Sequence, residues 1–171
     1  IGRILGRENI HARPASDGAT VFLYLGKGET KEHVLSALAK YSYAFNAYPK
    51  GKYPPYAHLG NGPRSADILL VCKPPYWVAG PEAFPAYTRW AGLTHVWPVT
   101  FTPAFGGLKA THGYDPHTVQ MHGIFFAWGA GVAHGKQISR LDMIDVHPTV
   151  MSLLGLQPGV PVDGHALALS P

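Results

Sequence analysis

The chain has 171 residues, of which 46% are hydrophobic and 14% are charged, and its formal net charge is +4 at pH 7. This apolar content is sufficient for a hydrophobic core, so intrinsic disorder is a poor explanation of the composition. The basic residues are spread along the chain and form no cluster interleaved with aromatic residues, so we expect no nucleic-acid-binding patch. Glycine (20 residues) and proline (16 residues) predict a loop-rich protein.

Cysteine content and hydropathy exclude several kinds of structural feature. The single cysteine, Cys72, excludes an intrachain disulfide and a multi-cysteine metal site. No apolar stretch approaches the roughly twenty residues that a membrane-spanning helix needs, and no leader pattern opens the sequence. Because the chain begins at Ile1, without a methionine, we expect a fragment or a processed product.

The first half of the chain contains two strand patterns and one helix pattern. Residues 19–25 (ATVFLYL) are rich in β-branched and aromatic residues between two glycines, which predicts a strand. A helix is predicted from Thr30, as N-cap, to about Lys40. The aromatic and proline-rich stretch 41–56 is expected to be irregular. Residues 66–72 (ADILLVC) form a nearly continuous apolar run, which is typical of a strand covered on both faces.

The second half begins with residues 73–104, whose scattered tryptophans and prolines indicate an insertion or cap. Residues 123–128 (GIFFAW) are predicted to form a third strand. A helix is predicted over 144–154, with Asp145 as its cap and Gly155 as its stop. Because strand and helix signals alternate, the pattern favours an α/β architecture in which at least part of the sheet is parallel.

The segment Thr111-His112-Gly113-Tyr114-Asp115-Pro116 carries the most specific pattern. His112, Gly113 and Asp115 resemble the Gly-x-His-Gly-x-Asp-Asn loop that supplies a zinc-binding histidine in nucleotide pyrophosphatase/phosphodiesterases of the alkaline phosphatase superfamily. Pro116 departs from the usual asparagine and has no N–H to donate, and Thr111 departs from the usual asparagine or phenylalanine.

The resemblance extends over most of the chain. Residues 121–131 (MHGIFFAWGAG) are similar to the strand and turn that follow the loop in the family, and 144–156 (IDVHPTVMSLLGL) to its closing helix. The resemblance implies the C-terminal part of such a protein. It implies a partial alkaline-phosphatase-like α/β fold, with a mixed, mostly parallel sheet flanked by helices and a loop-rich insertion.

The same resemblance implies an organisation in which 1–171 belong to one domain. Within it, 1–72 form a strand–helix–strand segment and 73–104 an insertion or cap. Residues 105–171 form the metal loop, the closing strand and the closing helix. The upstream part of the same domain is required to complete the fold and the site.

The activity implied by the resemblance is hydrolysis of phosphodiester or nucleotide pyrophosphate bonds, with two Zn²⁺ ions and a covalent phosphoenzyme in the full-length parent. The substrate is a small phosphodiester or nucleotide. His112 is the metal ligand expected in this chain. The nucleophile and the remaining ligands are expected upstream of Ile1, so the chain contains no assigned catalytic residue and is expected to be inactive alone. Family members are often exported, which implies a periplasmic or secreted protein.

The chemistry of the loop agrees with this expectation. A neutral imidazole nitrogen is a common zinc ligand, and an adjacent glycine lets the backbone bend close to the ion. Asp115 is expected to accept a hydrogen bond from backbone groups or from the other ring nitrogen of His112, which would orient the ring. One histidine cannot hold zinc tightly, since a tetrahedral site needs about four donors.

The sequence is also compatible with other interpretations. An alkaline phosphatase, a phosphonate hydrolase or a sulfatase of the same superfamily would share the closing strand and helix, and a noncatalytic structural or binding domain is the alternative from another class. Ordinary loop or helix roles are expected for the other histidines near the motif and the C-terminus, namely His117, His122, His147 and His165. Asp67 is expected to cap a strand or face solvent.

Overall fold

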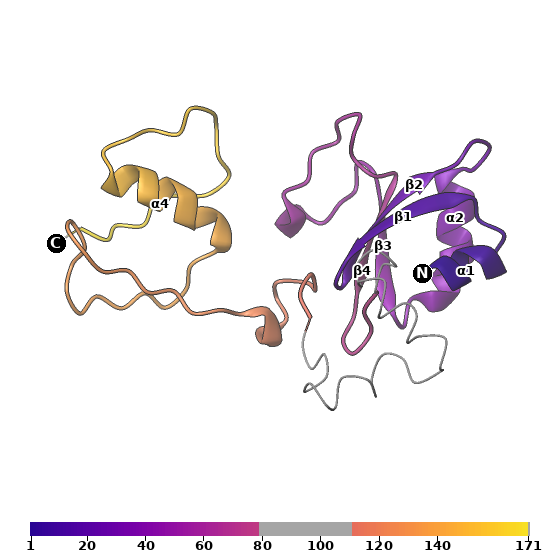
Figure 1. Ribbon diagram of the computed structural model, residues 1–171, viewed down its shortest axis with the longest axis horizontal. Helices are drawn as coiled ribbons and strands as arrows, with labels where there is room; N and C mark the ends of the chain where they lie inside the picture. Colours follow the sequence, from indigo (N-terminus) through magenta and orange to yellow (C-terminus); the bar gives the residue numbers. More distant parts are fainter. Residues whose placement is uncertain (79–110, 171) are drawn as a thin grey trace, which may run out of the picture. The chain divides into compact units, whose positions relative to one another are not determined.

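A computed structural model of the protein describes residues 1–78 and 111–170, and it separates into two compact units, Ile1–His122 and Gly123–Pro171. The elements of the first unit are α1 (Gly2–Arg7), β1 (Ala12–Asp17), β2 (Thr20–Leu25), α2 (Lys31–Leu38), η1 (Ala39–Tyr41), β3 (Phe45–Pro49), η2 (Pro55–Ala57), β4 (Ile68–Cys72) and η6 (Val119–Met121). Those of the second unit are η7 (Met143–Asp145) and α4 (Val146–Leu153). Figure 1 shows these elements along the chain.

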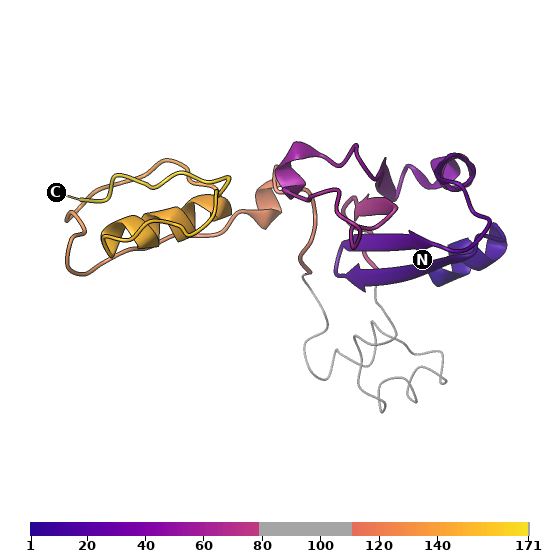
Figure 2. The ribbon, with the colours of Figure 1, turned by 90° about the horizontal axis from the view of Figure 1, so that it is seen from above.

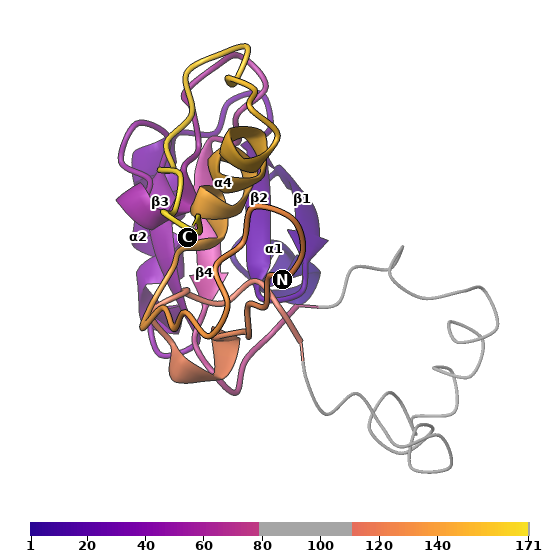
Figure 3. The ribbon, with the colours of Figure 1, turned by 90° about the vertical axis from the view of Figure 1, so that its left-hand side faces the viewer.

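The four strands form one sheet in the order β1-β2-β4-β3, with β1 and β3 at opposite edges (Figure 3). Every neighbouring pair is antiparallel. β1 and β2 are joined by a two-residue turn, which Figure 2 shows at one end of the hairpin. The prediction of a mixed, mostly parallel sheet flanked by helices is therefore wrong.

The position of β4 explains why the prediction of parallel strands failed. β2 and β3 run in the same direction, because each of them is antiparallel to β4. The chain between them contains α2, as a strand–helix–strand pattern requires. However, β4 lies between the two strands and pairs with both, so no two neighbours in the sheet are parallel. The arrangement is a split β-α-β unit extended by a hairpin.

The local predictions of β2, α2 and β4 are confirmed. β2 occupies Thr20–Leu25 and β4 occupies Ile68–Cys72, whose five residues are all buried, as expected for a strand covered on both faces. Thr30 caps α2, since its side-chain oxygen accepts a hydrogen bond of 3.2 Å from the backbone N–H of His33. Such caps satisfy one of the free N–H groups at the start of a helix.

The hydrophobic core lies on one face of the sheet. Alternate residues of β2 and β4 meet buried residues of α2 in a single cluster, which includes Val21, Leu23, Ile68, Leu70, Val34 and Leu38. Because side chains alternate along a strand, Thr20, Phe22 and Tyr24 lie on the opposite face of β2. The loop of the candidate site is bound at the turn between β1 and β2, where the Thr20 hydroxyl contacts it.

The two edge strands were not predicted. β1 (ARPASD) has no β-branched residue and contains Pro14, and β3 (FNAYP) lies in the stretch expected to be irregular. Proline lacks the N–H that a central strand must donate, and an edge strand tolerates it. Both strands therefore form because a neighbour supplies hydrogen bonds, while their own composition indicates no strand.

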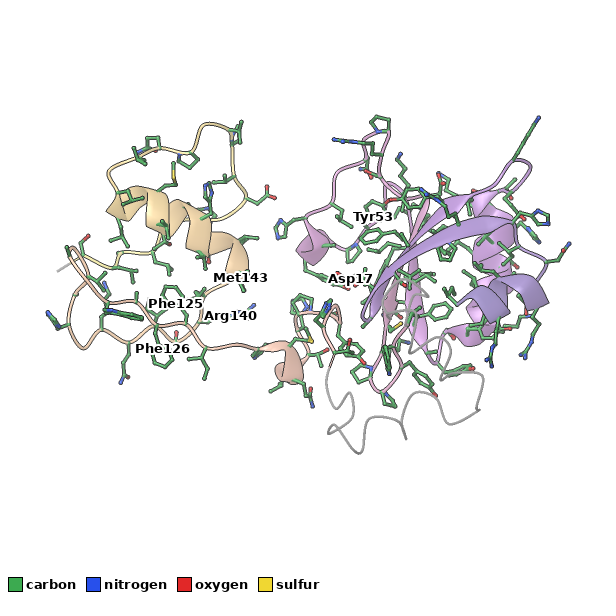
Figure 4. All side chains as sticks on the ribbon, in the orientation of Figure 1. Asp17, Tyr53, Phe125, Phe126, Arg140 and Met143 are labelled. Carbon is green, nitrogen blue, oxygen red and sulfur yellow. The ribbon has the colours of Figure 1, made fainter. Side chains whose placement is uncertain are left out.

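The predicted strand over 123–128 does not form among the described residues. These residues have no regular secondary structure, and the exposed fractions of Ile124, Phe126 and Trp128 are 83%, 77% and 87%. Figure 4 labels Phe125 and Phe126 on this irregular segment. A strand requires a neighbour for its N–H and C=O groups, and no strand among the described residues pairs with this one. Apolar composition alone was therefore insufficient.

The predicted C-terminal helix is confirmed as α4, and it ends as expected at Gly155. The N–H groups of Gly155 and Leu156 donate to the carbonyls of Ser152 and Met151, and Gly155 has a φ of +67°. This pattern is a Schellman motif, which glycine permits. The Asp145 side chain accepts hydrogen bonds from the N–H groups of Asp142 and His165 and makes none to α4 itself.

The second unit buries few large apolar side chains. Val150, Leu153 and Leu154 of this unit are exposed by 47%, 37% and 66%. Thr149 is buried instead, and its hydroxyl donates to the Asp145 carbonyl and accepts from the Leu167 N–H. No helix among the described residues is both long and apolar enough to cross a membrane.

Candidate functional site

The loop that carries His112 is attached to the turn between β1 and β2. The Ala19 N–H donates a hydrogen bond of 2.8 Å to the His112 carbonyl. The Thr20 hydroxyl donates one of 2.6 Å to the Gly113 carbonyl. Two consecutive carbonyls of the loop are therefore bound to two consecutive residues of the hairpin, which holds the backbone of His112 in place.

Two glycines make this close approach possible. A Cβ atom at Gly18 would lie 2.4 Å from the His112 carbonyl oxygen, and one at Gly113 would lie 2.9 Å from the Asp17 carbonyl oxygen. Their φ angles are +62° and +85°, which glycine adopts at little cost. The glycine beside the histidine thus lets two backbone segments pack together.

The imidazole of His112 projects from this fixed backbone into solvent. Its side chain is 67% exposed, and its Nε2 atom lies 3.5 Å from Oδ1 of Asp17, whose side chain is 82% exposed. Figure 4 labels Asp17 at the end of β1. The structure therefore brings together one imidazole and one carboxylate, both of which are accessible.

These two groups are suitable zinc donors, but they are too few for a complete site. Zinc accepts nitrogen from histidine and oxygen from aspartate, usually with four ligands in total. Among residues 1–78 and 111–170, no group of three or more His, Cys, Asp or Glu side chains is placed to hold a metal ion. The pair fits zinc only as part of a site that other residues complete.

The acid of the loop, Asp115, contacts a different histidine from the one expected. Asp115 Oδ1 accepts a hydrogen bond of 2.9 Å from the His117 N–H and lies 2.7 Å from His117 Nδ1. The expected bond to a backbone group is therefore present. The ring that Asp115 contacts, however, is that of His117 and not that of His112, so Asp115 does not orient the candidate ligand.

The contacts of Asp115 change its acidity. Partial burial raises the pKa of Asp115, but the hydrogen bonds from the backbone and ring of His117 lower it more, so the net pKa lies below its ordinary value.

The His117 ring also lies edge-to-face with the Tyr56 ring, with centroids 5.5 Å apart. Burial raises the pKa of the Tyr56 hydroxyl, and the neighbouring Tyr48 and Asp115 raise it further.

We predict that the contact between Asp115 and His117 persists below the ordinary pKa of an aspartate. The pKa of Asp115 is lower in the folded than in the unfolded protein, so its ionised carboxylate stabilises the fold. This stabilisation is complete above the unfolded-state pKa of 3.8 and is lost as the pH falls through the lower folded-state pKa. An NMR titration of the His117 amide should therefore show a midpoint below 3.8. The Asp115→Asn variant should lose this transition, and a wild-type midpoint at or above 3.8 would contradict the prediction.

The remaining residues singled out in the sequence have ordinary roles. His147 lies in the first turn of α4, and the His165 N–H donates to Asp145. His122 follows η6 directly. The Asp67 carboxylate accepts a hydrogen bond of 2.8 Å from the Leu25 N–H, so it joins the start of β4 to the end of β2.

Sequence reasoning missed Asp17 as a neighbour of His112. The two residues are far apart in the sequence, and Asp17 ends an edge strand that the sequence pattern did not reveal. An aspartate followed by glycine is a signal for a hairpin turn, and it was the available clue.

No protein-family model and no solved structure matches the chain.

Proposed function

We propose that this chain is the C-terminal part of a zinc-dependent hydrolase of phosphodiester or nucleotide pyrophosphate bonds. In this proposal His112 is a zinc ligand, and the upstream part of the same domain supplies the nucleophile and the remaining ligands. The observation that supports it is the exposed imidazole of His112 on a backbone held by the β1–β2 hairpin. The resemblance of His112, Gly113 and Asp115 to the zinc-binding loop of the phosphodiesterase family supports it independently.

A fixed backbone favours a metal ligand for an entropic reason. A ligand on a mobile loop loses conformational freedom when it binds, whereas the hydrogen bonds from Ala19 and Thr20 restrict the His112 loop beforehand. The Asp17 carboxylate adds negative charge 3.5 Å from the ring, which favours a cation nearby. Its exposure to solvent keeps this contribution small.

The chemistry of the proposed site divides between the ion and the chain. When bound, zinc polarises phosphoryl oxygens and stabilises negative charge on the attacking and leaving oxygens. The chain itself holds the backbone of the His112 loop through the hydrogen bond from Thr20 to the Gly113 carbonyl, and the lack of a side chain at Gly18 lets the loop approach the hairpin. No nucleophile is proposed among residues 1–171.

The test uses the chain alone. We expect Zn²⁺ added to residues 1–171 to shift the NMR signals of His112 and Asp17 with weak affinity, because two donors are fewer than the four of a tight site. Turnover of a chromogenic phosphodiester should be negligible. His122→Ala serves as the control and should leave the titration unchanged, whereas His112→Ala should remove it. Robust metal-dependent hydrolysis by the chain alone would contradict the proposal.

A further inference from the structure

A cleft of about 440 Å³ lies on the face of β2 opposite the core. Its walls include the aromatic rings of Phe22, Tyr24 and Tyr53, together with Leu59 and Arg64. None of its lining residues belongs to the His112 loop. Small-molecule sites commonly have volumes of roughly 300–1,000 Å³ and apolar or aromatic walls with few polar groups, and this cleft has both properties.

The wall formed by residues 60–66 is held by several hydrogen bonds. Lys50 Nζ donates to the Gly62 carbonyl at 2.7 Å, and the Ser65 hydroxyl donates to the Gly60 carbonyl at 2.5 Å. The Tyr53 hydroxyl donates to the Ala66 carbonyl, which fixes the edge of that ring (Figure 4). The shape of the cleft is therefore maintained by the protein itself.

The lining of the cleft carries a positively charged group at Arg64. Arg64 is the charged residue of the lining, and its exposed guanidinium forms no hydrogen bond or ion pair with a described residue. The guanidinium of Arg13 lies 5.2 Å from the centre of the Tyr24 ring. A guanidinium binds carboxylate and phosphate oxygens through paired N–H groups.

We propose that this cleft binds a small planar aromatic anion. The ring of the ligand packs against Tyr24, Tyr53 and Phe22, and its carboxylate or phosphate binds Arg64. The proposal needs no metal and does not rest on the function of His112. It therefore succeeds or fails separately from the hydrolase proposal.

The test is an NMR titration of the full chain with EDTA present. The probes are 4-hydroxybenzoate as an aromatic carboxylate, AMP as an aromatic phosphate, and 4-hydroxybenzamide as an uncharged ring. We expect at least one of the two anions to shift signals of the cleft and to bind at least about tenfold more tightly than the amide, because only an anion can pair with Arg64. The anion that binds more tightly identifies the acidic group that the site prefers.

Two variants assign the binding to the cleft. Arg64→Gln should weaken the anion at least about tenfold and leave the amide unchanged, and Tyr24→Leu should weaken both. Arg3→Gln, a control at an exposed arginine of α1, should change neither. Arg64 is exposed, so its replacement leaves the fold intact and the test stands even if Tyr24→Leu fails to fold. The proposal is overturned if no anion shifts the cleft, if the amide binds equally well, or if Arg64→Gln behaves like Arg3→Gln.

Discussion

Replacing His112 with alanine in the full-length protein is expected to lower zinc content and to reduce phosphodiester hydrolysis by about a hundredfold or more. Loss of an outer residue that merely orients a metal ligand typically costs about 10–100-fold, so loss of a ligand should cost at least the upper value. The side chain is 67% exposed, and therefore its removal should leave the fold intact. Metal analysis and a chromogenic phosphodiester assay measure the two effects.

His122→Ala provides the matched control for this experiment. His122 follows η6 in the same unit and is also exposed, but it has no assigned role in the site. We expect its replacement to leave metal content and hydrolysis unchanged. Unchanged zinc content in the His112→Ala variant would remove His112 from the site.

Replacing Gly18 with alanine should reduce activity about tenfold or more without altering any ligand, because small displacements of a positioned group are costly. A Cβ atom at this position would lie 2.4 Å from the His112 carbonyl oxygen, so the loop must move away from the hairpin. The positive φ of +62° adds a conformational cost of about 1–2 kcal/mol. Hydrolysis and thermal unfolding of the full-length variant measure the two consequences.

Gly28→Ala separates the clash from the backbone cost. Gly28 also has a positive φ, of +91°, but an added Cβ would meet nothing within 4 Å. This variant should therefore lose only the stability that corresponds to the backbone cost, less than Gly18→Ala loses, and keep its activity. Equal loss of activity in both variants would show that the contact between Gly18 and the His112 loop has no functional role.

The sequence predicted the elements whose own residues carry a clear pattern. β2 and β4 have continuous apolar runs, and α2 has its own cap at Thr30, so each pattern contains most of the information for its element. β1 and β3 are edge strands that depend on neighbours distant in sequence. The segment 123–128 shows the converse case, since a strand-like composition without a partner gives no strand among the described residues.

The candidate site was predictable only in part. The motif singled out His112 and the glycine beside it. Gly113 lies close to the backbone of the hairpin, whereas its expected role of letting the backbone approach a metal ion stays a prediction. The expected ring partner of Asp115 was wrong because local spacing could not distinguish the rings of His112 and His117. Asp17 was missed because its position depends on the whole hairpin, which a local pattern cannot reveal.

The central place of β4 determines when the sheet can be completed during synthesis. Of the four strands in this sheet, β4 is the last to leave the ribosome, yet it is the strand that joins β2 to β3. A nascent chain that ends before Ile68 has the hairpin and α2 but leaves β2 with an open edge and β3 without a neighbour. Unpaired edges of this kind promote aggregation, so residues 1–67 need protection until β4 emerges.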